Sequence, residues 1–276
     1  MIHELHYDNT NTYFIETDNR AILFDTGWAG SFPRLCRELG EKGLKLQSVQ
    51  YLMISHFHPD HMGLAGELTQ HEIVPVVMEN QVSYIHAADE ILKKDKRGGF
   101  VPIENANVKV LSFAESRAFL KSLGTEGEII PTPGHSDDSI SLCLDSGEVF
   151  VGDLYPFYEL KSHEEETVWE SWRAIMKRSP KKIYYGHARS YVCNGTEAEH
   201  VLQYKKTTVC PTQKNSRIYK DVEKIIKYID KGVSIDVIAL KLKKDPQFVQ
   251  DVCRMYLTHQ NVGVQGILDR IEIKGR

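Results

Sequence analysis

Short apolar runs alternate with polar turn residues through the first quarter of the chain. The runs at residues 12–16 and 21–24 are separated by Asp18, Asn19 and Arg20, which predicts antiparallel strands joined by a tight turn. Residues 49–55 form a longer, mostly apolar run. That pattern predicts a strand buried on both faces, and the strand leads directly into His56.

The central part of the chain repeats this alternation with helical stretches inserted. Further strands are predicted at residues 73–78, 108–113, 127–131, 140–144, 149–151 and 182–185, and helices at about 31–39, 63–68, 80–100 and 164–178. Pro75 marks its strand as an edge or bulged strand. Strands, an inserted helix and strands again favour an α/β fold in which two sheets stack face to face with helices outside. A doubly wound parallel sheet fits the order less well.

Helical spacing takes over from residue 214 onward. Residues 216–232, 234–242 and 245–259 each carry apolar side chains on one helical face, and Ser or Asp stands at each expected start. The spacing resembles a helix-turn-helix, and residues 261–268 could supply a wing. A small helical packing domain is the plainer interpretation, and the winged-helix alternative stays open.

Length and composition fit a globular protein of one or two domains. The chain has 276 residues, of which 41% are hydrophobic and 26% charged. We predict a catalytic domain over residues 1–205 and a helical domain over 214–276. Apolar runs stay well short of the roughly 18 residues that a membrane span needs, so no membrane partner is expected.

The cysteines and the N-terminal residues predict a cytoplasmic protein. Five cysteines are widely scattered and never form a CxxC pair, which argues against a disulfide framework and against a cysteine-based zinc site. The first residues carry no basic segment followed by a long apolar stretch, so we expect no secretory signal.

Charge is distributed unevenly along the chain. Residues 1–200 hold 19 Lys and Arg against 30 Asp and Glu, whereas residues 201–276 hold 15 against 8. A basic tail after an acidic body favours electrostatic docking of the tail on its own body or on a second copy, so a homo-oligomer is an open alternative. Contact between the tail and a nucleic acid is the other interpretation.

Residues 55–61 carry the strongest chemical signal, Ser-His-Phe-His-Pro-Asp-His. Three imidazoles and a carboxylate fall within six positions, directly after a predicted strand. So many polar groups on one short turn cannot all face an apolar core. Imidazole and carboxylate are common metal ligands, so this segment predicts metal coordination.

Four motifs together resemble the signature of the metallo-β-lactamase superfamily. They are HxHxDH at residues 56–61, TPGHS at 132–136, Gly152-Asp153 and Tyr185-Gly-His187, and they occur in the order expected for that family. The resemblance covers roughly residues 1–195. It implies a four-layer αββα sandwich for this part of the chain, followed by the helical C-terminal domain.

The resemblance also implies a dinuclear metal site. His56, His58 and His135 would hold one metal, Asp60, His61 and His187 would hold the other, and Asp153 would bridge them. Imidazole and carboxylate donors without thiolate suit two divalent zinc ions, with iron or manganese as alternatives. The family's nucleophile is a metal-bridging hydroxide. Asp25 is expected to form structural hydrogen bonds and is not predicted to be a ligand.

The predicted function is metal-dependent hydrolysis of a small ester, thioester or lactone, because the hydroxyacylglutathione hydrolases and lactonases of this superfamily resemble the chain in compact length and in appended helices. Asp60 and Tyr155 are the predicted catalytic residues, the latter through a phenol that could polarise a carbonyl. One alternative is a phosphodiesterase or ribonuclease with a nucleic-acid-binding tail, and another is a non-catalytic, metal-stabilised ligand-binding protein. We interpret the basic residues 93–97 as a solvated charged face, with contact to an anionic substrate as the alternative.

Overall fold

Two compact units make up the chain. The computed structural model describes residues 1–18, 20–156, 160, 166–195, 197, 201, 217–229 and 231–258. Unit 1 consists of Met1–Leu154 and Thr167–Leu202, and unit 2 of Tyr155–Glu166 and Gln203–Arg276. The predicted domain boundary, between residues 205 and 214, lies outside the described residues and stays a prediction.

Unit 1 contains two sheets. The first has the spatial order β1 (Ile2–Leu5), β2 (Thr12–Glu16), β3 (Ala21–Phe24), β4 (Val49–Met53), β5 (Val74–Met78) and β6 (Lys109–Leu111). The second has the order β11 (Tyr191–Val192), β10 (Lys182–Tyr184), β9 (Glu148–Phe150), β8 (Ile140–Leu144) and β7 (Gly127–Pro131). Strands β3 to β6 run parallel, as do β9 and β10, and the other pairs are antiparallel.

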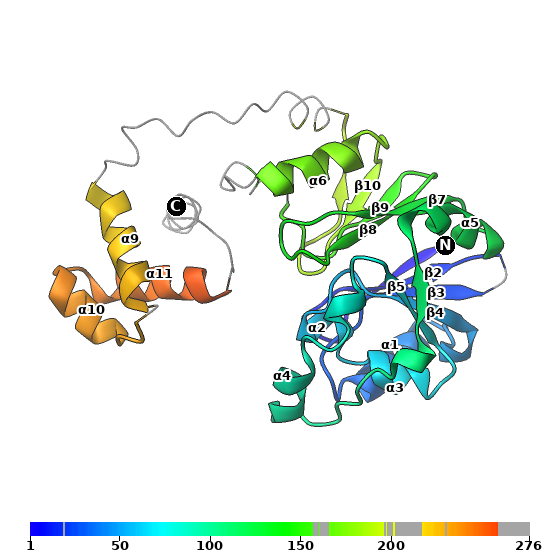
Figure 1. Ribbon diagram of the computed structural model, residues 1–276, viewed down its shortest axis with the longest axis horizontal. Coiled ribbons are helices and arrows are strands. Elements are labelled where there is room, and N and C mark those ends of the chain that lie inside the picture. Colours follow the sequence, from blue (N-terminus) through cyan, green and yellow to red (C-terminus); the bar gives the residue numbers. More distant parts are fainter. Residues whose placement is uncertain are drawn as a thin grey trace. The chain divides into compact units, whose positions relative to one another are not determined.

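The helices described in unit 1 lie around the two sheets (Figure 1). They are α1 (Phe32–Glu41), α2 (Pro59–Met62), α3 (Ala65–Thr69), α4 (Asp89–Lys94), α5 (Ser116–Ser122) and α6 (Glu166–Met176, which begins in unit 2). The prediction of a helix over 80–100 was wrong for most of that range, because the α-helical part is only α4. Its helical backbone ends at Asp95, which is extended, and Gly98 and Gly99 have φ of +66° and +75°.

Period-two alternation in the central strands separates two cores. On β2 to β4, Tyr13, Ile22 and Met53 face the second sheet and pack against its side chains. Their neighbours Leu23 and Leu52 face the opposite way and pack among residues of α1 and α3. Two sheets with helices outside confirm the predicted αββα sandwich.

Strand β5 corrects one local prediction. Pro75 was expected to mark an edge or bulged strand, yet β5 lies between β4 and β6. Pro75 is opposite Leu52 of β4, whereas pairing with β6 begins only at Val76. The proline therefore lies beyond the end of the ladder with β6, so its missing N–H costs no hydrogen bond to that strand.

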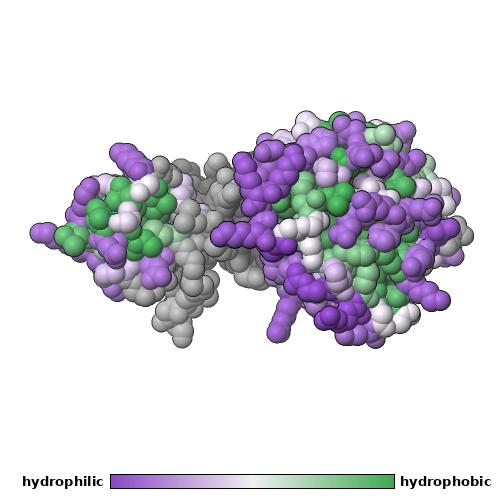
Figure 2. Space-filling view, turned by 90° about the horizontal axis from the view of Figure 1, so that it is seen from below, coloured by the Kyte–Doolittle hydropathy of each residue, from purple (hydrophilic) through white to green (hydrophobic). Residues whose placement is uncertain are grey.

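The described part of unit 2 contains three helices that pack on one another. They are α9 (Arg217–Ile229), α10 (Ile235–Leu242) and α11 (Pro246–Thr258), all predicted from helical spacing. Val222, Ile238 and Val252 are fully buried in their shared core. Apolar residues also reach the surface of this unit (Figure 2), among them Val237 and Leu240 of α10. The predicted wing at 261–268 lies outside the described residues.

None of the helices that the structure describes combines the length and the apolar character needed to cross a membrane.

Candidate metal centre

The histidine-rich segment lies at the carboxyl end of β4, at one end of the first sheet. Strand β4 ends at Met53, and the chain continues through Ser55 to His56 and His58. Pro59 then occupies the first turn of α2, where its fixed φ suits a helix start. The short helix presents the last two polar residues of the motif, Asp60 and His61.

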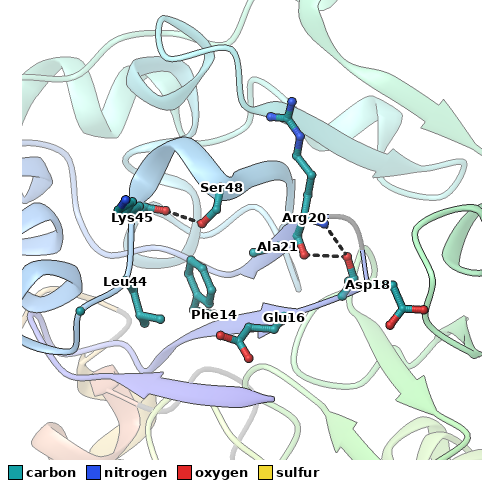
Figure 3. Close-up of a pocket in the computed structure, with 10 residues that line it drawn as sticks. Phe14, Glu16, Asp18, Arg20, Ala21, Leu44, Lys45 and Ser48 are labelled. Atoms are coloured by element: carbon teal, nitrogen blue, oxygen red, sulfur yellow. Dashed lines mark hydrogen bonds between the residues drawn. The ribbon is translucent and has the colours of Figure 1, made fainter.

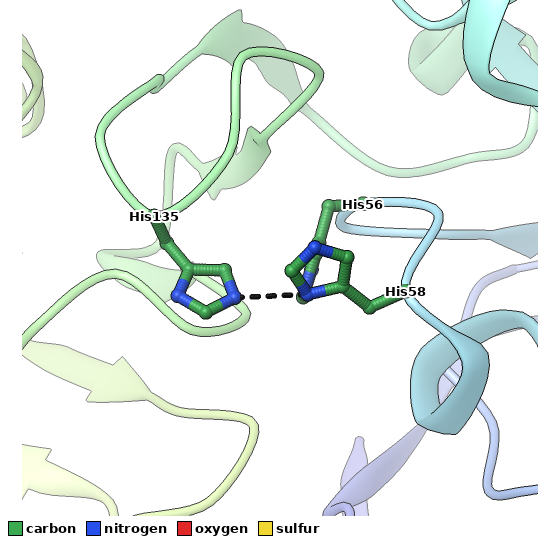
Figure 4. A group of neighbouring side chains, drawn as sticks. All are labelled: His56, His58 and His135. Carbon is green, nitrogen blue, oxygen red and sulfur yellow. Dashed lines mark hydrogen bonds between the residues drawn. The ribbon is translucent and has the colours of Figure 1, made fainter. Parts of the chain in front are cut away.

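The first group of candidate ligands consists of three imidazoles (Figure 4). His56 and His58 follow β4, and His135 comes from the loop between β7 and β8. One ring nitrogen of each lies within 4.8 Å of the other two. His135 Nε2 and His58 Nδ1 are 3.1 Å apart, so the two sheets bring residues distant in sequence to one point.

The second group adds a carboxylate to two imidazoles. His187, from the loop after β10, has its Nε2 3.1 Å from Asp60 Oδ2 and 3.3 Å from His61 Nε2. Asp153, three residues past the end of β9, lies between the groups. Its Oδ1 is 3.2 Å from His61 Nε2, and its Oδ2 is 3.5 Å from His135 Nε2.

Ser55 determines which nitrogen of His56 faces the cluster. A serine hydroxyl has one proton, and Ser55 Oγ donates it to Asp25 Oδ2 at 2.8 Å. His56 Nδ1, 3.0 Å from the same oxygen, must therefore be the donor of that contact. His56 Nε2 is left with a lone pair, fully buried and without a hydrogen-bond partner among the described residues. A buried polar atom of this kind calls for a ligand.

The histidines of the second group are oriented in the same manner. His61 Nδ1 is 2.9 Å from Asp25 Oδ2, and His187 Nδ1 donates to the carbonyl oxygen of Asn9 at 2.9 Å. Each imidazole thus turns Nε2 toward the other donors. A carboxylate or carbonyl on the outer nitrogen is the usual support of a metal-binding histidine. Asp25 therefore has the structural hydrogen-bonding role predicted for it.

Two supporting residues were missed by the sequence analysis. Asn9 donates from Nδ2 to Asp60 Oδ2 at 3.3 Å, and Asp138 accepts from the backbone N–H of Phe57 at 2.7 Å. Both contacts join segments more than 50 residues apart. No local pattern marks either residue, although Asp138 follows His135 by only three positions.

Two glycines permit the close approach of these segments. Gly152 has φ of +55°, and a Cβ there would lie 2.3 Å from Ser55 Oγ. A Cβ on Gly186 would lie 2.4 Å from Asp153 Oδ1. Side chains at either position would push the strand ends apart, so glycine is required where the motifs meet.

Burial keeps the first group uncharged. It is the main cause that lowers the pKa of His56 well below its usual value, and it also lowers the pKa of His58. Burial likewise lowers the pKa of His135 to about 4. The three nitrogens are therefore neutral donors at physiological pH.

Negative charge dominates the second group. Burial opposes ionisation of Asp60, but its hydrogen bond with His187 and the charge of His61 lower its pKa to about 2. Burial also opposes protonation of His187, yet contacts with Asp153 and Asp60 raise its pKa to about 10. The carboxylates thus favour positive charge here, for which protons and metal cations compete.

A family comparison agrees with this arrangement. The model of the metallo-beta-lactamase superfamily matches residues 7–187, which include every residue of both groups. The chain belongs to the metallo-β-lactamase superfamily.

Relatives within the superfamily are distant in sequence. The chain is 29% identical over 188 residues to the probable metallo-hydrolase MJ0888 of Methanocaldococcus jannaschii, covering 65% of this chain and 87% of that protein. It is 24% identical over 199 residues to the uncharacterized protein YobT of Bacillus subtilis, covering 65% and 83%. The sequence similarity therefore covers about two thirds of this chain.

Solved structures of superfamily members share the fold. A metallo-β-lactamase family protein of Thermus thermophilus, TTHA1429, aligns with a TM-score of 0.58 at 17% identity, covering 100% of this chain and 93% of that one. TTHA1623, solved in a di-iron-bound form, aligns with a TM-score of 0.53 at 20% identity, covering 70% and 94%.

The donor set fits the metal ions that this superfamily implies. The first group offers three imidazole nitrogens and the second offers two imidazoles and a carboxylate, each set within the reach of one cation, and Asp153 adjoins both. The buried Nε2 of His56 has no other described partner to satisfy it. Tyr155, the other predicted catalytic residue, is 6% exposed and belongs to unit 2, so its role stays a prediction.

A separate pocket lies at the other end of the first sheet (Figure 3). It has a volume of 390 Å³, and its lining includes Phe14, Ala21, Leu44 and Ser48. Ala21 begins β3 and Ser48 directly precedes β4, whereas the histidines follow the opposite end of β4. The pocket and the metal centre are thus separated by the length of the strands.

Proposed function

We propose that this chain is a hydrolase that uses two divalent cations to cleave a small ester, thioester or lactone. One cation would be held by His56, His58 and His135, and the other by Asp60, His61 and His187, with Asp153 shared between them. The observation that carries the proposal is the convergence of these seven donors from four separate segments of the chain onto one site. Structural ion pairs alone would not leave the Nε2 of His56 buried without a described partner.

Zinc is the proposed metal because all seven donors are imidazole or carboxylate. Iron and manganese are alternatives with the same donor preference, and the di-iron form of TTHA1623 supports iron as one of them. When bound, two such ions would lower the pKa of a shared water and polarise the bond to be broken.

The chain's own residues prepare the site. Asp25 holds the Nδ1 proton of His61, and the Asn9 carbonyl holds that of His187, so both imidazoles keep their orientation without any bound group. Asp60 is proposed as a ligand that also contacts the reacting molecule, and Tyr155 as a phenol that polarises the substrate carbonyl. The free cysteines among the described residues are consistent with the proposed cytoplasmic location.

The test combines a metal-loaded substrate panel with one ligand variant. The full chain, supplied with zinc, iron or manganese, is expected to hydrolyse at least one ester, thioester or lactone. His58→Ala should lower kcat/KM by about 10³-fold or more, because the substitution removes one of the three proposed ligands of the first cation. His86→Ala is the matched control, since His86 is exposed and bonds to Asp89 and Asn105, away from the cluster. Undiminished turnover in His58→Ala would contradict the proposal.

A further inference from the structure

An arginine from the loop after α4 is stacked on a tryptophan beside the metal centre. The guanidinium carbon of Arg97 lies 3.5 Å from the centre of the Trp28 ring. Trp28 follows β3, three residues past Asp25. At this distance the cation lies flat against the aromatic face, which restricts where the guanidinium can point.

Backbone contacts place Trp28 next to α2, the helix that carries Asp60. A Cβ on Gly63, the residue after α2, would lie 2.6 Å from the Trp28 carbonyl carbon. Trp28 also donates its backbone N–H to Asp8 Oδ2 at 3.1 Å, and the residue after Asp8, Asn9, donates to Asp60. The stacked pair therefore borders the second group of ligands.

The loop that carries Arg97 is held in place before any ligand arrives. Gly98 and Gly30 both have positive φ, and a Cβ on Gly30 would lie 2.9 Å from the Gly98 carbonyl oxygen. Asp95 accepts the backbone N–H of Arg97 at 2.8 Å. Residues 95–99 thus pack closely on residues 27–30.

One edge of the Arg97 guanidinium remains available. Asp95 accepts from Nε at 2.8 Å and from Nη2 at 2.7 Å, which occupies two of the five N–H groups. Within the described part of the chain the other three have no partner, and the side chain is 45% exposed. The hydrogen bond with Asp95 raises the pKa of Arg97, and the charges of Asp8 and Asp60 add to this effect. Arg97 is therefore a permanent cation within electrostatic reach of Asp60.

Neighbouring basic residues do not share these features. Lys93 and Lys94 pair with Glu90 on the surface of α4, and their side chains are 52% and 80% exposed. Those two lysines fit the solvated face predicted from the sequence. Arg97 differs because an aromatic ring and a carboxylate fix its plane while one edge stays open.

We propose that Arg97 binds a carboxylate of the substrate, at a point remote from the bond that is cleaved. The inference rests on the proposed function and narrows it to carboxylate-bearing esters, thioesters or lactones. A planar guanidinium with an open edge matches the two oxygens of a carboxylate. Residues 1–200 carry 19 basic against 30 acidic residues, so an anionic substrate needs local positive charge of this kind.

The test compares dicarboxylates with monocarboxylates of equal length by titration calorimetry on the metal-loaded full chain. Succinate, glutarate and adipate are paired with butyrate, pentanoate and hexanoate. One carboxylate can occupy the metal centre in both members of a pair, and only the dicarboxylate has a second one for Arg97. The wild type should bind at least one dicarboxylate about tenfold more tightly than its partner.

Variants assign that preference to one residue. Arg97→Ala should abolish the tenfold preference, and so should Arg97→Gln, which keeps a planar group over Trp28 without the charge. Lys96→Ala, which removes a positive charge from the neighbouring position, should retain it. A wild type without the preference, or an Arg97 variant that keeps it, would overturn the proposal.

Metal content measured in the same samples separates two kinds of failure. A chain that takes up no metal would contradict the proposed function itself. A metal-loaded chain that hydrolyses esters but shows no dicarboxylate preference would contradict only the role of Arg97.

Discussion

The two halves of the metal centre differ in charge and in the way they are supported. The first group contains only imidazoles, whose pKa values burial lowers, so it presents neutral donors. The second group contains Asp60, and the contacts of its carboxylate help to raise the pKa of His187 to about 10. A metal cation must therefore displace protons at the second group but not at the first, so metal binding at the second group should depend more strongly on pH.

The supporting contacts of the two halves come from different parts of the chain. Asp138 holds the backbone of Phe57, which lies between His56 and His58 of the first group. Asp25 and Asn9 hold the second group through His61, His187 and Asp60. Asp25 also accepts the Ser55 hydroxyl proton, and Ser55 contacts His56, so Asp25 supports both halves. Asp138 supports the first half and Asn9 the second, and Asp153 adjoins both.

The largest effect is expected for the shared residue. Asp153→Ala removes the carboxylate whose two oxygens face His61 and His135. Both metals should bind more weakly, and kcat/KM should fall by about 10³-fold or more. Metal analysis after dialysis, together with steady-state kinetics, checks this. If the variant keeps both metals and full activity, Asp153 does not link the two groups.

A paired comparison should separate the halves. Asp25→Ala leaves His61 Nδ1 and the Ser55 hydroxyl without their buried acceptor, so we expect a loss of about 3 kcal/mol in unfolding free energy. Because Ser55 also orients His56, metal binding should weaken at both groups. Asp138→Ala should weaken the first group, with a smaller loss of about 1 to 2 kcal/mol. Denaturant unfolding and metal titration measure both quantities. Equal effects of both variants on both metals would show that Asp138 does not act on the first group alone.

The smallest effect is expected for Asn9→Ala. The substitution removes the hydrogen bond from Nδ2 to Asp60 but keeps the backbone carbonyl that holds His187. Asp60 is partly exposed, so the loss should stay near about 1 kcal/mol and appear as a few-fold weaker affinity for one metal. Competition with a chelator measures that affinity. An effect as large as that of Asp153→Ala would mean that Asn9 does more than orient Asp60.

Local periodicity was sufficient to predict most of the fold. The strands at 127–131 and 140–144 have the predicted bounds, and the three C-terminal helices begin and end within a few residues of prediction. Their apolar spacing agrees with the packing they adopt. The prediction of a helix over residues 80–100 was wrong for most of that range. The backbone is extended at Asp95, whose carboxylate accepts a hydrogen bond from Arg97. The helix α5 was missed.

The candidate ligands could be named from four motifs, but their supports could not. Each motif is local, and the structure brings the motifs together at the ends of strands. Asn9 and Asp138 act across 51 and 81 positions of sequence, so their roles depend on the completed fold. The stacking of Arg97 on Trp28 is equally non-local. From sequence, Arg97 could not be distinguished from the lysines beside it.

We propose that seven side chains hold two cations side by side. Anomalous diffraction from crystals of the full chain, collected at the absorption edge of the bound metal, tests this most directly. We expect two peaks, one among His56, His58 and His135 and one among Asp60, His61 and His187, with Asp153 contacting both. A protein saturated with metal that shows no anomalous peak within this cluster would rule out the proposed site.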